Sequence, residues 1–80
     1  MKRVYLLRSR SDSTRRYIGS SRDFRKRLEH HNAGKSPHTA KYRPWQPVVV
    51  IRFEDEQKAE AFERYLKAGS GHAFANRHFW

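Results

Sequence analysis

The sequence has no cysteine, so it offers neither a disulfide framework nor a thiolate metal site, which fits a reducing compartment. Acidic residues are few as well, because 8 Asp and Glu stand against 18 Lys and Arg. No apolar run approaches the roughly 18 residues of a membrane-spanning helix, and the apolar stretch near Met1 is too short for a signal peptide. We therefore expect a cytoplasmic protein without a membrane segment.

Positive charge interleaved with aromatic side chains dominates what is present. The formal net charge is +10, and 14% of the residues are aromatic although only 36% are hydrophobic. A chain of 80 residues is the size of one small domain, and we expect residues 1–80 to form it. Basic domains usually bind polyanions, and the aromatic residues favour nucleic acid as the partner.

Three stretches have the composition of β-strands. Residues 3–8 and 16–19 flank a polar turn and predict a hairpin that brings Tyr5 near Tyr17, although the pattern leaves open whether they share a face. Residues 48–54 contain three valines and an isoleucine, which favours a strand with little exposed surface at the centre of the sheet.

A first helix is expected between an N-cap at Ser21 and a stop at Gly34. Phe24 and Leu28 are four residues apart, so they lie on one stripe that can face a core. Residues 35–47 follow, and their three prolines predict an irregular loop of a length that often carries function.

A second helix is expected from about residue 56 to residue 68, with Asp55 as its N-cap and residues 69–71 as its stop. Glu63 falls inside the apolar stripe of this helix, where an unpaired carboxylate is costly. It can form a salt bridge to an arginine, or it can bind a hard divalent cation such as Mg²⁺. The aromatic residues 72–80 are compatible with a short helix packed on the core.

Arg27 and His31 lie four residues apart, on the stripe beside the apolar side of the first helix. An arginine there can bind a phosphate through two hydrogen bonds and stabilise the charge of a transition state. The histidine can relay a proton or hold a tyrosine hydroxyl. Both residues can also be ordinary members of a solvated basic helix, and Tyr5 and Tyr17 can be packing residues of the sheet.

Four short motifs follow one another along nearly the whole chain: Val4-Tyr5-Leu6-Leu7, Tyr17-Ile18-Gly19-Ser20, Arg27-x-x-x-His31-Asn32-x-Gly34 and Ala61-Phe62-Glu63-x-x-x-Lys67. In this order and spacing they resemble the GIY-YIG nuclease family. The similarity is to its small stand-alone bacterial members, which are related to the N-terminal nuclease of the excinuclease C subunit. The first motif reads Val-Tyr-Leu where the family has Gly-Ile-Tyr, but it keeps the tyrosine.

The resemblance implies an α+β fold, with a small three-stranded antiparallel sheet flanked by helices. It also implies an endonuclease that hydrolyses DNA phosphodiester bonds by in-line attack of water, with Mg²⁺ or Mn²⁺ as cofactor, in DNA repair or recombination. By the resemblance, Glu63 is the metal ligand and Arg27 stabilises the transition state. Tyr17 or Tyr5 orients or deprotonates the water with support from His31, and we expect Arg27 and the metal to lower the tyrosine pKa.

Phosphate-binding residues are expected in and before the first helix and in the loop after it: Arg22, Arg25, Lys26, Lys35, His38, Lys41 and Arg43. Asn76 is the only downstream candidate for an asparagine that many family members carry after the glutamate. We expect DNA as the partner, weak sequence specificity, and a protein partner that supplies targeting. The alternatives are a nucleic-acid-binding module of the same fold without catalysis, and a basic protein associated with RNA or the ribosome.

Overall fold

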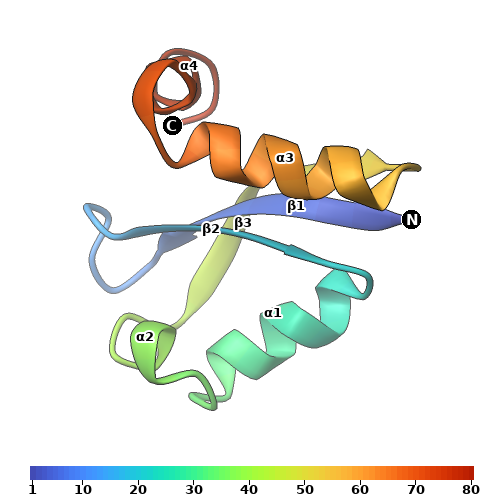
Figure 1. Cartoon of the computed structure of the whole chain (residues 1–80). Helices are drawn as coiled ribbons and strands as arrows, with labels where there is room; N and C mark the ends of the chain where they lie inside the picture. The colour runs from blue at the N-terminus through green and yellow to red at the C-terminus, as the bar shows by residue number, and fades with distance from the viewer.

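A computed structural model describes residues 1–80 as a three-stranded antiparallel sheet with helices on both faces (Figure 1). The elements in chain order are β1 (Lys2–Ser9), β2 (Arg16–Ser21), α1 (Phe24–Asn32), α2 (Pro37–Ala40), β3 (Trp45–Phe53), α3 (Glu56–Leu66) and α4 (Gly69–His78). Helices α3 and α4 lie on one side of the sheet, and α1 and α2 lie on the other. This arrangement confirms the expected α+β fold class. No helix combines the length and the apolar composition that crossing a bilayer demands.

The order of the strands is β2-β1-β3, so β1 is central and β3 lies at an edge. The expectation of a central strand at residues 48–54 is therefore wrong. Residues 4–7 of β1 are fully buried, whereas β3 after Trp45 has only half-buried and exposed positions and leaves Val50 39% exposed. The valines of β3 reflect the preference of β-branched residues for strands, including strands that are covered only in part. The strand that is buried on both faces is β1.

Residues 35–47 are more regular than the prolines suggested. Pro37 occupies the start of the short helix α2, where its missing N–H is not needed. Strand β3 begins at Trp45 and runs through Pro47, which an edge strand tolerates because one row of its N–H groups has no partner strand. The prolines therefore mark the start of α2 and the edge strand β3.

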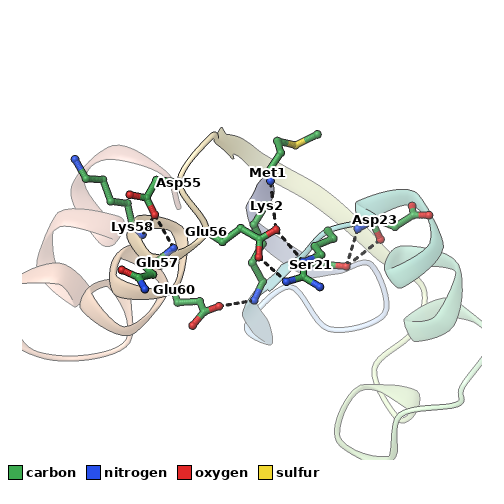
Figure 2. Close-up of polar contacts among 10 residues, drawn as sticks. Met1, Lys2, Ser21, Asp23, Asp55, Glu56, Gln57, Lys58 and Glu60 are labelled. Atoms are coloured by element: carbon green, nitrogen blue, oxygen red, sulfur yellow. Dashed lines mark hydrogen bonds and ion pairs between the residues drawn. The ribbon is translucent and has the colours of Figure 1, made fainter.

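Helix α1 is capped by Asp23 and not by Ser21. The Asp23 carboxylate accepts a hydrogen bond of 3.1 Å from the Lys26 N–H, which is the usual N-cap contact. The Ser21 hydroxyl instead bonds the backbone of Asp23 and shapes the turn before the helix (Figure 2). Gly34, with a φ of 77°, follows the end of the helix as expected.

Helix α3 begins after Asp55 as expected, and the Asp55 carboxylate accepts from the first-turn N–H groups (Figure 2). It ends at Leu66, and Gly69 serves as the first residue of α4 where the sequence suggested only a stop. The tail thus forms a ten-residue helix, Gly69–His78, whose buried residues pack on the core.

The sheet separates two cores because successive side chains of β1 point to opposite faces. The larger core, under α3 and α4, contains Val4, Leu6, Ala59, Leu66 and Ala75. The smaller core, under α1 and α2, contains Tyr5, Leu7 and Trp45, with Tyr17, Phe24, Leu28 and Tyr42 packed against it. Phe24 and Leu28 therefore face a core, as their spacing predicted.

Candidate active site

The candidate site lies along β2, the edge strand on the side of the sheet opposite to β3. Tyr5 of β1 is paired with Gly19 of β2, and the missing side chain of the glycine makes room for two rings. A Cβ atom at Gly19 would lie 2.6 Å from the Tyr5 Oη and 2.9 Å from the Tyr17 Cε1. The two ring centroids are 6.2 Å apart on one face, which settles the question that the sequence left open.

A buried hydrogen-bond chain runs from Tyr5 through His31 to Thr39. The Tyr5 Oη lies 3.2 Å from the His31 Nε2, and the His31 Nδ1 lies 2.8 Å from the Thr39 Oγ1. All three residues are at most 2% exposed. Trp45 fixes the far end, because its indole N–H donates to the Thr39 carbonyl at 2.8 Å. His31 therefore holds a tyrosine hydroxyl, one of the two roles that the sequence suggested for it.

Burial raises the pKa of Tyr5 well above its ordinary value, and Tyr17 adds to this effect. The Arg27 charge acts in the opposite direction but does not outweigh burial. The expectation that Arg27 would bring the pKa of this tyrosine down is therefore wrong for Tyr5 in the protein alone. Tyr5 keeps its proton at neutral pH and acts as a hydrogen-bond donor.

Burial lowers the pKa of His31, and the neighbouring Arg27 and His30 lower it further. The imidazole is therefore neutral at neutral pH. Since Tyr5 is protonated, its hydroxyl donates to the His31 Nε2, and the network assigns the ring proton to Nδ1, which donates to Thr39.

Glu63 reaches β2 from the other face of the sheet. The Ser20 hydroxyl donates to the Glu63 Oε1 at 2.5 Å, and the Lys67 ammonium lies 2.8 Å from Oε2. Burial pushes the pKa of Glu63 upward, but the hydrogen bonds from Lys67 and Ser20 and the charge of Lys2 lower it overall. The ionised carboxylate stays 21% exposed. Its cationic partner is thus a lysine one turn along the same helix, and not the arginine that the sequence suggested.

A metal at this place would have Glu63 as its carboxylate ligand. The chain holds no group of three or more His, Cys, Asp or Glu that could enclose an ion. One ionised, partly exposed carboxylate fits Mg²⁺ or Mn²⁺ better than it fits a cation that needs an all-protein cage, since Mg²⁺ fills most of its shell with water and substrate phosphate.

An open cavity of about 430 Å³ adjoins this part of β2. Its walls come from β1, from the end of β2 and from the start of α1: Lys2, Ser20, Ser21, Arg22, Asp23 and Arg27. A neighbouring cavity of about 240 Å³ shares Arg27 and adds Lys26 and His30. Arg27 is therefore exposed on a basic surface, although its charge reaches Tyr5. Tyr5, Tyr17 and His31 thus lie in contact on the α1 face with Arg27 close enough to act on Tyr5, whereas Glu63 reaches Ser20 of the same strand from the α3 face.

Arg22 is not a free phosphate ligand in this structure. Its Nε and Nη2 atoms donate to the two carboxylate oxygens of Glu56 at 2.8 and 2.6 Å, and Figure 2 shows the contacts around that carboxylate. Glu56 also accepts from the amino group of Met1 at 3.2 Å. These contacts lower the pKa of Glu56 to about 2, so Arg22 is held against the start of α3.

The other predicted phosphate-binding residues lie on exposed positions along α1, α2 and the segments after them: Arg25, Lys26, Lys35, His38, Lys41 and Arg43. Lys26 and Lys35 share a cavity of about 350 Å³ on the outer side of α1. Asn76 lies on α4 and accepts a 3.0 Å hydrogen bond from Arg16, with no contact to Glu63. Sequence reasoning missed Ser20 and Thr39, which hold the catalytic candidates in place.

Comparison with known proteins agrees with the α+β fold. The family model described as "GIY-YIG catalytic domain" matches residues 1–75. The "Structure-specific endonuclease subunit SLX1" of Candida dubliniensis is 38% identical over 82 aligned residues, which cover 94% of this chain but 27% of that protein. The chain thus spans about a quarter of the length of this curated relative, and no solved structure matches it. Since the family model covers nearly all of it, the chain belongs to the GIY-YIG nuclease family.

Proposed function

We propose that this chain is a divalent-metal-dependent endonuclease that hydrolyses DNA phosphodiester bonds at the edge of β2. The observation that carries the proposal is the ionised Glu63 carboxylate, held by Ser20 across the strand from the tyrosines and Arg27. The net charge of +10 supplies attraction for the phosphate backbone.

Each residue has a distinct task in this proposal. Glu63 holds Mg²⁺ or Mn²⁺, which supplies positive charge beside the scissile phosphate when bound. Arg27 donates hydrogen bonds to the phosphate oxygens and stabilises the added charge as the water oxygen bonds to phosphorus and the bond to the leaving sugar oxygen breaks. Tyr5, protonated and fixed by His31, keeps the site ordered. Tyr17 is less buried than Tyr5, so we assign to it the orientation of the attacking water.

The test is the nicking of supercoiled plasmid by the wild type and by Glu63→Gln, with Mg²⁺, with Mn²⁺ or with EDTA. We expect nicking that requires metal and that falls by about a hundredfold or more in the variant, while DNA binding measured in EDTA stays intact. Glu60→Gln is the matched control, because Glu60 is an exposed carboxylate on the same helix that pairs with Lys2. Nicking that persists in Glu63→Gln would refute the assignment of the metal ligand.

One observation favours the alternative of a binding module without catalysis. Lys67 already neutralises Glu63, so the carboxylate is satisfied without a metal. Under this alternative, the folded wild type binds DNA but nicks no plasmid with either metal, and Lys67→Gln does not restore nicking. Metal-dependent nicking by the wild type excludes it.

We further propose a role in DNA repair or recombination, together with a protein partner that supplies targeting. The support is that the curated relative is by its name a subunit of a structure-specific endonuclease, and that this chain spans 27% of it. We expect cells without the gene to be more sensitive to DNA damage and to be rescued by the wild type but not by Glu63→Gln. Equal survival of the deleted and parental strains would count against this role.

A further inference from the structure

A separate cavity of about 320 Å³ lies beside the candidate active site, between β2, the end of α3 and the tail of the chain. It is lined by Arg16, Tyr17, Ile18, Leu66, Lys67, His72 and Trp80. The proposed reaction uses only Tyr17 from this set, so the rest of the cavity has no assigned role.

The lining combines flat or apolar side chains with basic ones and contains no acidic side chain. The half-buried Tyr17, Ile18 and Trp80 offer apolar contact surface above the buried Leu66, whereas the remaining three side chains are Arg, Lys and His. Proteins that bind single-stranded nucleic acid use this combination, because bases stack on aromatic rings and phosphates bind to nearby cations.

Two arginines lie against the Trp80 ring, which is part of the lining of this cavity. Arg8 and Arg16 face each other directly on β1 and β2, and two like charges in that position repel. Neither arginine takes part in an ion pair. Instead the guanidinium carbons lie 5.9 and 5.0 Å from the centre of the Trp80 ring, and Arg16 donates to Asn76. The structure therefore holds two uncompensated cations against one aromatic ring, which favours an anionic group there.

Two residues connect this cavity to the candidate active site. The Tyr17 ring lines the cavity and also packs edge-on against His31, with centroids 4.8 Å apart. Lys67 lines the cavity and pairs with Glu63. A molecule in the cavity is therefore adjacent to the place where the phosphate would react.

We propose that this cavity binds an unpaired nucleotide of the DNA strand that is cut, with its base on Trp80 and its phosphate on Arg16. This inference rests on the proposed nuclease function and names the substrate class of the same site. A base inside a duplex is paired and stacked and cannot enter such a cavity without being extruded. The chain consequently prefers DNA that offers an unpaired nucleotide next to the cleaved bond.

The test compares the binding of fluorescein-labelled oligothymidylate of about ten nucleotides with that of a duplex of equal length, in EDTA so that no cleavage occurs. The variants are Trp80→Leu, which keeps apolar bulk, and Arg16→Gln, whose side chain is exposed. The matched control is Arg52→Gln, because Arg52 is an exposed arginine on β3, at the other edge of the sheet. We expect Trp80→Leu to weaken oligothymidylate binding about tenfold and duplex binding much less. Arg16→Gln follows the same pattern, whereas Arg52→Gln affects both DNAs alike.

Tryptophan fluorescence gives a second readout that a folding defect does not mimic. Trp45 is 4% exposed and Trp80 is half-buried, so a base that stacks on Trp80 quenches the accessible part of the emission. We expect oligothymidylate to quench the wild type strongly and Trp80→Phe weakly. Unfolding in any variant is checked by its thermal transition, and Arg16→Gln carries the test if Trp80→Leu does not fold.

Equal losses on single-stranded and duplex DNA, or oligothymidylate binding that leaves the Trp80 emission unchanged, would overturn this inference. Its failure is distinct from that of the proposed function. If the wild type nicks plasmid but the variants show no selective loss, only the cavity assignment fails. If the wild type nicks no DNA with either metal, the proposed function fails, and with it the placement of the nucleotide beside a cleaved bond.

Discussion

At the scale of single residues, Gly19 leaves no room for a side chain. A Cβ atom there would lie 2.6 Å from the Oη and 2.8 Å from the Cζ of Tyr5, a fully buried ring. We expect Gly19→Ala to lower the free energy of unfolding by about 1–3 kcal/mol, as overpacking usually does. It should also reduce nicking more than DNA binding, because the Tyr5 hydroxyl moves relative to His31. Chemical denaturation and plasmid nicking measure the two effects, and a variant equal to the wild type in both would contradict this account.

His31 makes stability depend on pH in a defined direction. Its pKa in the folded protein is lowered by burial, with Arg27 and His30 contributing, so the unfolded chain binds a proton more readily. Above about pH 6.5, His31 is unprotonated in both the folded and the unfolded chain. As the pH drops below this value and through the pKa that His31 has in the folded protein, the free energy of unfolding falls.

The variant His31→Gln removes this titration, and we expect it to flatten the dependence of stability on pH between about pH 5 and pH 7. The matched control is His38→Gln, since His38 is exposed and makes no contact of this kind. Urea denaturation at several pH values measures the slopes. If the free energy of unfolding has the same slope against pH in His31→Gln and in the wild type, His31 is not the source of the pH dependence.

The sequence identified the candidate catalytic residues but not the side chains that hold them. Tyr5, His31 and Glu63 are recognisable because the motifs place reactive residue types at fixed spacings. Ser20 and Thr39 are common polar residues, and their importance comes only from contacts with partners 43 and 8 positions away. The pKa of Tyr5 could not be inferred either, because it depends on how deeply β1 is covered.

At the scale of secondary-structure elements, the cap of α1 also belongs to the candidate site. The Asp23 carboxylate caps the helix and lines both cavities that contain Arg27. We expect Asp23→Asn to keep the cap and leave stability nearly unchanged, since asparagine caps about as well. It should also raise DNA affinity by removing a negative charge beside Arg27. Asp23→Ala should instead lose about 1 kcal/mol of stability.

Thermal denaturation and DNA binding by fluorescence anisotropy separate the two roles of Asp23. The variant Asp55→Ala is the control, because Asp55 caps α3 in the same way and lines neither cavity. If Asp23→Asn binds DNA no more tightly than the wild type, the cavities around Arg27 are not a phosphate site.

Element types were more predictable than element positions in the sheet. The runs at residues 4–7 and 48–51 are both apolar and β-prone, so composition alone favours either one as the central strand. The order β2-β1-β3 is decided by which strand both helical layers cover, and that depends on pairings between distant residues. The N-cap was misplaced by two residues for a similar reason, since Ser21 and Asp23 are both good caps.

At the scale of the whole molecule, the charge of +10 makes DNA binding depend on salt. Each basic residue that contacts a phosphate steepens the dependence of log affinity on log salt by about 0.9. We expect Arg25→Gln to reduce this slope by nearly that amount. Glu56→Gln should raise affinity, because it releases Arg22 from its carboxylate partner and makes it available to phosphate.

Anisotropy titrations of a labelled duplex over a range of salt concentrations measure these slopes. Glu54→Gln serves as the control for charge alone, since Glu54 is an exposed carboxylate without an ion pair. An equal gain in affinity for Glu54→Gln and Glu56→Gln would show that net charge, and not the release of Arg22, is responsible.

The central place of β1 has a consequence for the order in which the protein takes shape during synthesis. The first strand finds β2 immediately, but its other partner, β3, leaves the ribosome only after α1 and α2 have been made. Trp45, which closes the tyrosine core, emerges at the start of β3, and Glu63 follows on α3. We expect pulse-labelled hydrogen exchange during refolding to protect the amides between β1 and β2 before those of β3. A nascent chain therefore cannot assemble the candidate site until Glu63 has emerged.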